Sequence, residues 1–139
     1  MIKLSPKGFT LIEVMVVVVI LSILAVFVVP KIMDKPEQAR KTQVKQNLRI
    51  IEQSLNMYKL DNSFYPSTDQ GLEALISKPS GSPEPRGWNK EGYINRMPKD
   101  PWGGDYQYLN PGTRGKIDIF SFGPDGTASD DDIGNWDLN

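Results

Sequence analysis

Residues 8–19 read GFTLIEVMVVVV, and Glu13 places a carboxylate in a run that is otherwise almost wholly apolar. Over 9–29 the only polar residues are Thr10, Glu13 and Ser22. A helix rises about 1.5 Å per residue, so a helix over 9–29 is long enough to cross the roughly 30 Å hydrocarbon core of a bilayer. The run is also longer than the apolar part of a cleavable secretory signal, which has about 7–15 residues. We therefore expect the first half of a long helix to be transmembrane.

The charges that flank this run predict its orientation. Lys3 and Lys7 precede it, which favours a cytoplasmic N-terminus and an exported body, although Lys31 and Lys35 weaken that bias. A charged Glu13 would cost roughly 2.5–3.5 kcal/mol inside a membrane. Either Glu13 lies near the helix end or is protonated, or another molecule supplies a cation, because the run itself contains no Lys or Arg.

The stretch KGFTLIEV, residues 7–14, resembles the class III signal of type IV pilins and pseudopilins. The resemblance implies that residues 1–8, MIKLSPKG, are a basic leader that prepilin peptidase removes. The cut would fall between Gly8 and Phe9, with N-methylation of Phe9. It also implies a homopolymer in which the helices leave the membrane lipid for a filament core. There Glu13 of one copy would pair with the Phe9 amine of its neighbour, and this pair would set the register.

Downstream of the apolar run, the pattern predicts a body at 30–139 with an α+β fold. Apolar residues recur at helical spacing at Val44, Leu48, Ile51, Leu55 and Tyr58. One helix from the membrane segment to about Leu60 is expected, with two helices separated by a break at 30–36 as the alternative. Residues 107–109 and 116–122 are typical of two antiparallel strands joined by a turn at 110–115. The long helix should pack on this small sheet.

Two shorter patterns lie between the helix and the strands. Ser67 and Gln70 have the spacing of a capping box, which predicts a short helix through Leu72, Leu75 and Ile76. Residues 77–92 are dense in Pro, Gly and Ser, which indicates an irregular surface loop. Trp88 is the large apolar residue of that loop and should anchor it to the body.

The C-terminal stretch FGPDGTASDDDIGNW, residues 122–136, gathers carboxylates in a loop. A solvated acidic turn is one interpretation. The other is a calcium site, because adjacent aspartates repel one another and Ca²⁺ takes 6–8 oxygen ligands in flexible loops. A core this small is marginal, and the chain has no Cys for a disulfide, so a metal is the next candidate for stabilisation. Ile133 and Trp136 have the character of core anchors at the end of the loop.

A wider resemblance rests on three stretches: YKLDNSFYPSTDQGLEAL, PKDPWGGDYQYLNPG and FSFGPDGTASDDDIGNW. Together they resemble the major pseudopilins of type II secretion systems, and the resemblance covers essentially the whole chain. This resemblance implies a type IV pilin-like fold and a calcium ion in the C-terminal loop. The implied ligands are the carboxylates of Asp125, Asp131 and Asp132 and the backbone carbonyls of Phe122 and Ser129. Asp130 remains a rival to Asp131, because the loop is one residue shorter than the family pattern.

The sequence is compatible with three functions to different degrees. The first is a subunit that polymerises into the type II secretion pseudopilus and drives export of folded proteins across the outer membrane. Its partners would be further copies, minor pseudopilins, prepilin peptidase and the inner-membrane assembly platform, with the body in the bacterial periplasm. The second is a type IV pilin of an adhesion, motility or DNA-uptake fibre, many of which carry a C-terminal disulfide that this chain cannot form.

The third function, a membrane-anchored enzyme that uses Mg²⁺ for phosphoryl chemistry, is disfavoured. No Gly-rich phosphate cradle accompanies the acidic cluster, and the chain has no His and no Cys, which removes the commonest general base and the thiol nucleophile. The net charge of −1 gives no reason to expect a nucleic-acid partner. We therefore expect no enzyme.

Overall fold

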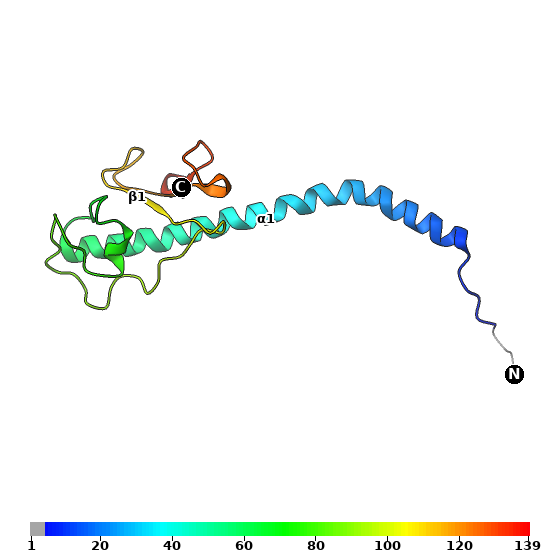
Figure 1. The fold of residues 1–139 in the computed structure, drawn as a ribbon, viewed down its shortest axis with the longest axis horizontal. Helices are drawn as coiled ribbons and strands as arrows, with labels where there is room; N and C mark the ends of the chain where they lie inside the picture. The colour runs from blue at the N-terminus through cyan, green and yellow to red at the C-terminus, as the bar shows by residue number, and fades with distance from the viewer. Residues whose placement is uncertain (1–4) are drawn as a thin grey trace. The chain divides into compact units, whose positions relative to one another are not determined.

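The computed structural model describes residues 5–139, apart from the side chains of residues 28–34. The chain divides into two units, Met1–Gln38 and Ala39–Asn139, which are described separately below. Helix α1, Leu11–Asn62, contributes to both units (Figure 1). Helix is assigned at every residue of this range, Pro30 and Pro36 included, so the expectation of one helix is confirmed and the alternative of two helices is not.

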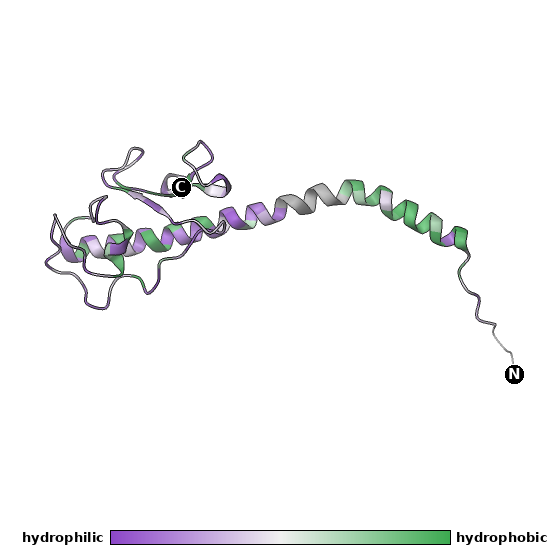
Figure 2. Cartoon of the chain, in the orientation of Figure 1, coloured by the Kyte–Doolittle hydropathy of each residue, from purple (hydrophilic) through white to green (hydrophobic). Residues whose placement is uncertain are grey.

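The N-terminal unit exposes its apolar side chains. Over 9–27 the exposed fractions of the large apolar residues run from 49% at Val14 to 89% at Phe9, and this part of α1 is strongly hydrophobic in Figure 2. Over the described parts of α1, 11–27 and 35–62, no stretch reaches the length and apolarity of a membrane span. These apolar side chains find no cover within their own unit.

The second unit is built on the predicted apolar stripe of α1. All five members of that stripe are fully buried, and they form the core with side chains from the rest of the body: Leu72, Leu75, Tyr106, Tyr108, Ile117, Ile119 and Ile133. Figure 1 shows the sheet region beside this part of α1. The helix thus supplies one wall of the core, as its spacing predicts.

The sheet has three short antiparallel strands in the order β1–β2–β3. β1 spans Gln107–Leu109 and β2 spans Asp118–Ser121, where a longer strand over 116–122 was expected. β3, Ile133–Gly134, was not predicted, because two residues are too few to show an alternating pattern. A Cβ on Gly134 would overlap the Trp136 ring, so glycine is required where this ring packs on the strand.

The end of α1 is tied to the surface loop by a buried asparagine. The Asn62 amide nitrogen donates to the Tyr58 carbonyl at 2.9 Å, and its amide oxygen accepts from the Gly87 nitrogen at 3.0 Å. Trp88 anchors the same loop, since its indole N–H donates to the Ala74 carbonyl at 2.8 Å. The expected role of Trp88 is therefore confirmed, and the helix ends two residues beyond the predicted Leu60.

The predicted capping box is present at the next element. Ser67 N–H donates to the Gln70 side chain at 3.0 Å, and Gln70 N–H donates to the Ser67 hydroxyl at 3.2 Å. The helix that follows is one short 3₁₀ turn, η1, over Leu72–Leu75. Ile76 therefore lies just beyond the helix that was expected to contain it.

Candidate functional site

The first turn of α1 holds Glu13 within its own chain. The Thr10 backbone N–H donates to Glu13 Oε2 at 2.9 Å, and the Glu13 N–H donates to the Thr10 hydroxyl at 3.3 Å. Thr10 also accepts the first helical hydrogen bond, from Val14 N–H at 3.3 Å. This reciprocal arrangement is a capping box, and it places the carboxylate at the positive end of the helix.

The other polar side chain of this segment is also satisfied locally. Ser22 donates its hydroxyl to the Val18 carbonyl one turn back, at 2.7 Å. Each of the three polar side chains over 9–27 therefore has a hydrogen-bond partner in its own chain. A segment of this kind can enter apolar surroundings without leaving a hydroxyl unpaired.

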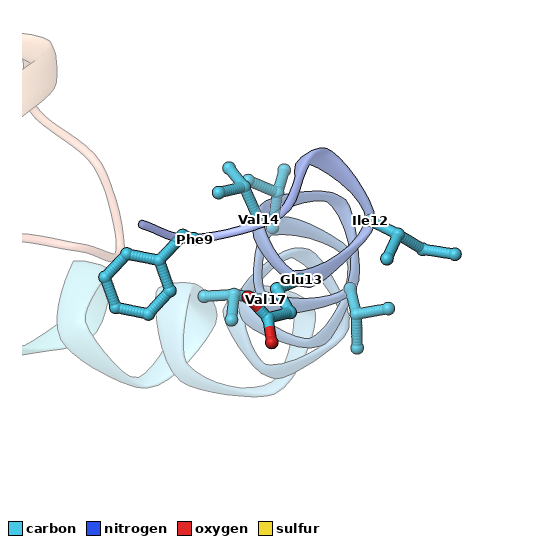
Figure 3. A pocket seen from close by; sticks show the side chains of 7 residues that line it. Phe9, Ile12, Glu13, Val14 and Val17 are labelled. Carbon is cyan, nitrogen blue, oxygen red and sulfur yellow. The ribbon is translucent and has the colours of Figure 1, made fainter. Parts of the chain in front are cut away.

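Phe9 and Glu13 line the same shallow apolar hollow at the start of the helix (Figure 3). The remaining lining residues are Ile12, Val14, Val16, Val17 and Val18. Figure 3 shows the Phe9 ring on one side of the Glu13 carboxylate and Ile12 on the other. The expected assembly residues therefore lie together on one apolar surface.

The expected cleavage point lies outside the helix. Gly8 and Phe9 have no regular secondary structure, and Phe9 is 89% exposed. A Cβ built on Gly8 would meet nothing within 4 Å. The peptide bond between these residues is thus open to another molecule.

The C-terminal acidic loop folds around Ser129. The Ser129 hydroxyl donates to Asp125 Oδ2 at 2.9 Å, and its backbone N–H donates to Asp132 Oδ1 at 3.3 Å. The Asp131 N–H in turn donates to the Ser129 hydroxyl at 3.3 Å. Two of the three expected carboxylate ligands therefore contact the same serine.

The expected metal ligands are of the chemical type that calcium binds, but their arrangement fits a calcium site less well. All are oxygen donors, as Ca²⁺ prefers. The Ser129 carbonyl accepts from Asp132 N–H at 3.3 Å, so it takes part in the loop's own hydrogen bonding. Among the described residues, no three Asp or Glu side chains are grouped closely enough to hold a metal ion. Binding through all three carboxylates would require the loop to rearrange.

Asp100, a buried carboxylate outside the acidic loop, holds the start of that loop in place. Asp100 is 6% exposed and accepts the Ser121 hydroxyl on Oδ2 at 2.8 Å. Ser121 in turn accepts the Gly123 N–H at 3.1 Å, where the 3₁₀ turn η2, Gly123–Asp125, begins. Asp100 also accepts the Gly104 N–H at 2.7 Å. Two loops that are distant in sequence are thereby joined at the end of β2.

A second buried carboxylate, Asp118, closes the turn before β2. It is 1% exposed and accepts hydrogen bonds from the backbone of Thr113, Arg114 and Gly115. Burial by itself would raise the pKa of Asp118, but these bonds and one from the Thr113 hydroxyl outweigh it and lower the pKa below its usual value. The charge is therefore stabilised by turn dipoles without a cation.

An asparagine side chain secures the end of the chain to β2. The Asn135 amide oxygen accepts the Ile119 N–H at 3.2 Å, and its amide nitrogen donates to the Ile117 carbonyl at 2.9 Å. Trp136, in the same 3₁₀ turn η3, Asn135–Asp137, packs against Phe120 with ring centroids 5.7 Å apart. The Asn135 amide and the Trp136 ring thus hold the end of the chain against β2.

Comparison with known proteins identifies the family. The family model described as type II secretion system protein G matches residues 31–136, and a prokaryotic N-terminal methylation motif matches residues 5–29. The chain belongs to the type II secretion system protein G family. The methylation motif spans the proposed leader cut and Glu13.

Relatives in this family align along almost the whole chain. The type II secretion system core protein G of Pseudomonas aeruginosa is 57% identical over 137 residues, covering 96% of this chain and 96% of that protein. The Vibrio cholerae protein of the same name is 56% identical over 138 residues, covering 96% and 94%. The crystal structure of the major pseudopilin from the type 2 secretion system of enterohaemorrhagic Escherichia coli matches with a TM-score of 0.74 and 55% identity. That match covers 78% of this chain and 96% of the other.

Several residues that organise this chain were missed from its sequence. Thr10 was missed although TLIE, residues 10–13, has the T-x-x-E spacing of a capping box. Asp100 precedes a Pro-Trp-Gly-Gly turn, which is a weak local signal for a carboxylate that binds turn N–H groups. Nothing in the sequence marked Asp118, which lies within the expected strand over 116–122.

Proposed function

We propose that this chain is the structural subunit that polymerises into the pseudopilus of a type II secretion system. The proposal rests chiefly on relatives 50–57% identical over nearly the whole chain, each named type II secretion system core protein G. Growth of the pseudopilus would drive folded proteins across the outer membrane. The likeness to a major pseudopilin favours this role over a type IV pilin of another fibre.

Assembly follows from the properties of the N-terminal unit. Its exposed apolar side chains need either lipid or other helices around them, because burial of apolar surface is favourable by roughly 25 cal/mol per Å². We propose that residues 9–29 anchor the subunit in the inner membrane before assembly. In the filament they would pack against the same segment of neighbouring copies.

Cleavage would change the surroundings of Glu13. Hydrolysis between Gly8 and Phe9 by prepilin peptidase would create an amine one residue before the Thr10 N–H that already contacts Glu13. The methylation motif over 5–29 supports processing at this point and methylation of Phe9. We propose that the carboxylate is held by its own chain first and then also pairs with the amine of a neighbouring copy.

The place of the protein in the cell follows from the same proposal. The leader, residues 1–8, would face the cytoplasm and be removed there, and the body would lie in the periplasm. The partners would be further copies, minor pseudopilins, the peptidase and the inner-membrane assembly platform. The role is structural, and no catalytic step is assigned to the chain.

Calcium binding in the C-terminal loop remains part of this proposal. Asp125 and Asp132 both contact Ser129, so a small movement of Asp131 or Asp130 could add a further oxygen. Bound calcium would neutralise the adjacent aspartates and hold the loop against the sheet. The ligands would be Asp125, Asp131 and Asp132 with the carbonyls of Phe122 and Ser129.

Deletion of the gene tests the function. Loss of the subunit should trap folded secreted hydrolases in the periplasm while surface pili of other systems persist. Complementation with the intact gene should restore secretion, and complementation with Glu13→Val should not. Loss of surface pili with normal secretion would instead support a type IV pilin.

A further inference from the structure

Asp100 is a buried carboxylate that takes no part in the proposed set of calcium ligands. Its Oδ1 accepts the backbone N–H groups of Trp102 at 3.1 Å and of Gly104 at 2.7 Å. Its Oδ2 accepts the Ser121 hydroxyl at 2.8 Å. A buried charge is costly unless hydrogen bonds satisfy it, and here both oxygens accept such bonds. The carboxylate therefore has a fixed position in the body.

Ser121, the last residue of β2, links this carboxylate to the acidic loop. Its side chain is fully buried, and its hydroxyl accepts the Gly123 N–H at 3.1 Å. A serine hydroxyl carries one hydrogen, and Asp100 accepts it, so the lone pairs of the same oxygen are turned toward Gly123. Phe122, whose carbonyl is an expected calcium ligand, lies between the two residues that this hydroxyl joins.

Gly123 extends the same constraint to both halves of the acidic loop. Its φ of +75° lies in the left-handed region that favours glycine, and the turn η2 that it begins also contains Asp125. A Cβ built on Gly123 would lie 3.7 Å from the Asp131 carbonyl oxygen, so its backbone packs against the far half of the loop. The expected ligands Phe122, Asp125 and Asp131 therefore lie within or against the segment that this chain of hydrogen bonds places.

We propose that Asp100 is a positioning residue for calcium in the acidic loop and acts through Ser121. Side chains that orient metal ligands from behind are important for binding, and their replacement weakens metal affinity about 10–100-fold. Asp100 and Ser121 act in this way because they place the Phe122 carbonyl and the start of η2. The inference rests on the calcium binding proposed above and adds two residues outside the ligand set on which the affinity depends.

Calcium titration of the full chain in detergent, measured by isothermal titration calorimetry, tests this role. Ser121→Ala breaks the link without a change of charge, so the dissociation constant for calcium should rise about tenfold. Asp100→Asn keeps the shape of the side chain but removes the charged acceptor, and it should have a similar effect. The double variant should bind little more weakly than either single variant, because both changes break the same chain of hydrogen bonds.

Two matched controls separate positioning from charge and from general destabilisation. Asp105→Asn removes the charge of an exposed carboxylate that lines the same hollow as Asp100 and Asp125. Ser54→Ala removes a buried hydroxyl of α1, which donates to the Ile50 carbonyl at 2.9 Å. Both should leave the dissociation constant nearly unchanged. The Tm of every variant is measured in EGTA alongside the titration.

The outcomes separate this inference from the proposed calcium site. If the natural chain takes up no calcium, the calcium site fails, and the inference fails with it. If the natural chain binds calcium and Ser121→Ala and Asp100→Asn bind it equally well, the inference alone is overturned. A lower Tm in EGTA would then show that the two residues only stabilise the body. A loss of affinity in Ser54→Ala as large as in Ser121→Ala would also overturn it.

Discussion

Thr10 and Glu13 form a reciprocal capping box at the start of α1. The carboxylate accepts the Thr10 N–H at 2.9 Å, and the hydroxyl accepts the Glu13 N–H at 3.3 Å. Glu13 is thus not an isolated charge in an apolar run. It caps its own helix, and under the proposed function it would also pair with the amine of a neighbouring copy.

Replacement of Thr10 tests the capping role. Thr10→Ala removes the hydroxyl and should cost about 1 kcal/mol at the helix terminus, whereas Thr10→Ser should be nearly neutral. Amide hydrogen exchange of the full chain in detergent should therefore be about fivefold faster in the first turn of Thr10→Ala. Equal exchange in Thr10→Ala, Thr10→Ser and the natural chain would show that the box does not stabilise the helix.

The buried Asp118 predicts a dependence of stability on pH. Its pKa in the folded body is lowered, so the stability it contributes is complete above its ordinary value of 3.8 and is lost as pH falls toward the lower folded value. Asp118→Asn should cost about 2 kcal/mol at pH 7, because several hydrogen bonds to a charged acceptor are weakened.

Thermal unfolding of the body from Lys31 onward measures this effect. The difference in Tm between the natural body and Asp118→Asn should be largest near neutral pH and should shrink below about pH 4. The other carboxylates are common to both proteins, so they cancel in the difference. A gap in Tm that stays constant from pH 7 to pH 3 would contradict the role assigned to Asp118.

At the scale of elements, features that follow local sequence patterns could be predicted, whereas contacts between distant segments could not. The core stripe of α1, the capping box at Ser67 and the anchoring of the loop by Trp88 all follow local rules and are confirmed. β3 and the Asn135 contact with β2 depend on the packing of distant residues. No pattern within a few residues of the sequence encodes them.

The acidic loop is the element whose role most needs measurement. If calcium holds it, EGTA should lower the Tm of the purified body, and Asp125→Asn should remove most of that effect. The matched change Asp105→Asn, at an exposed carboxylate outside the loop, should leave the response to EGTA intact. A melting curve unchanged by EGTA, with no calcium in the purified protein, would remove the calcium site.

At the scale of the whole molecule, the two units differ in how far their apolar side chains are buried. The N-terminal unit carries apolar surface that needs neighbours, and the body carries a core closed by buried polar side chains such as Asp100, Asp118 and Asn62. From the sequence, where hydropathy falls abruptly after residue 29, we expected an apolar segment over 9–29 and a body over 30–139. The hydrogen bonds of these buried polar side chains were not predicted, because they depend on which turns lie against which strands.

The most direct test of the account is the mass of this chain in filaments isolated from native cells. The account predicts a single main species that begins at Phe9 and carries one added methyl group at its N-terminus. Filaments built from chains that still begin at Met1, or filaments of the secretion system that lack this chain, would contradict it.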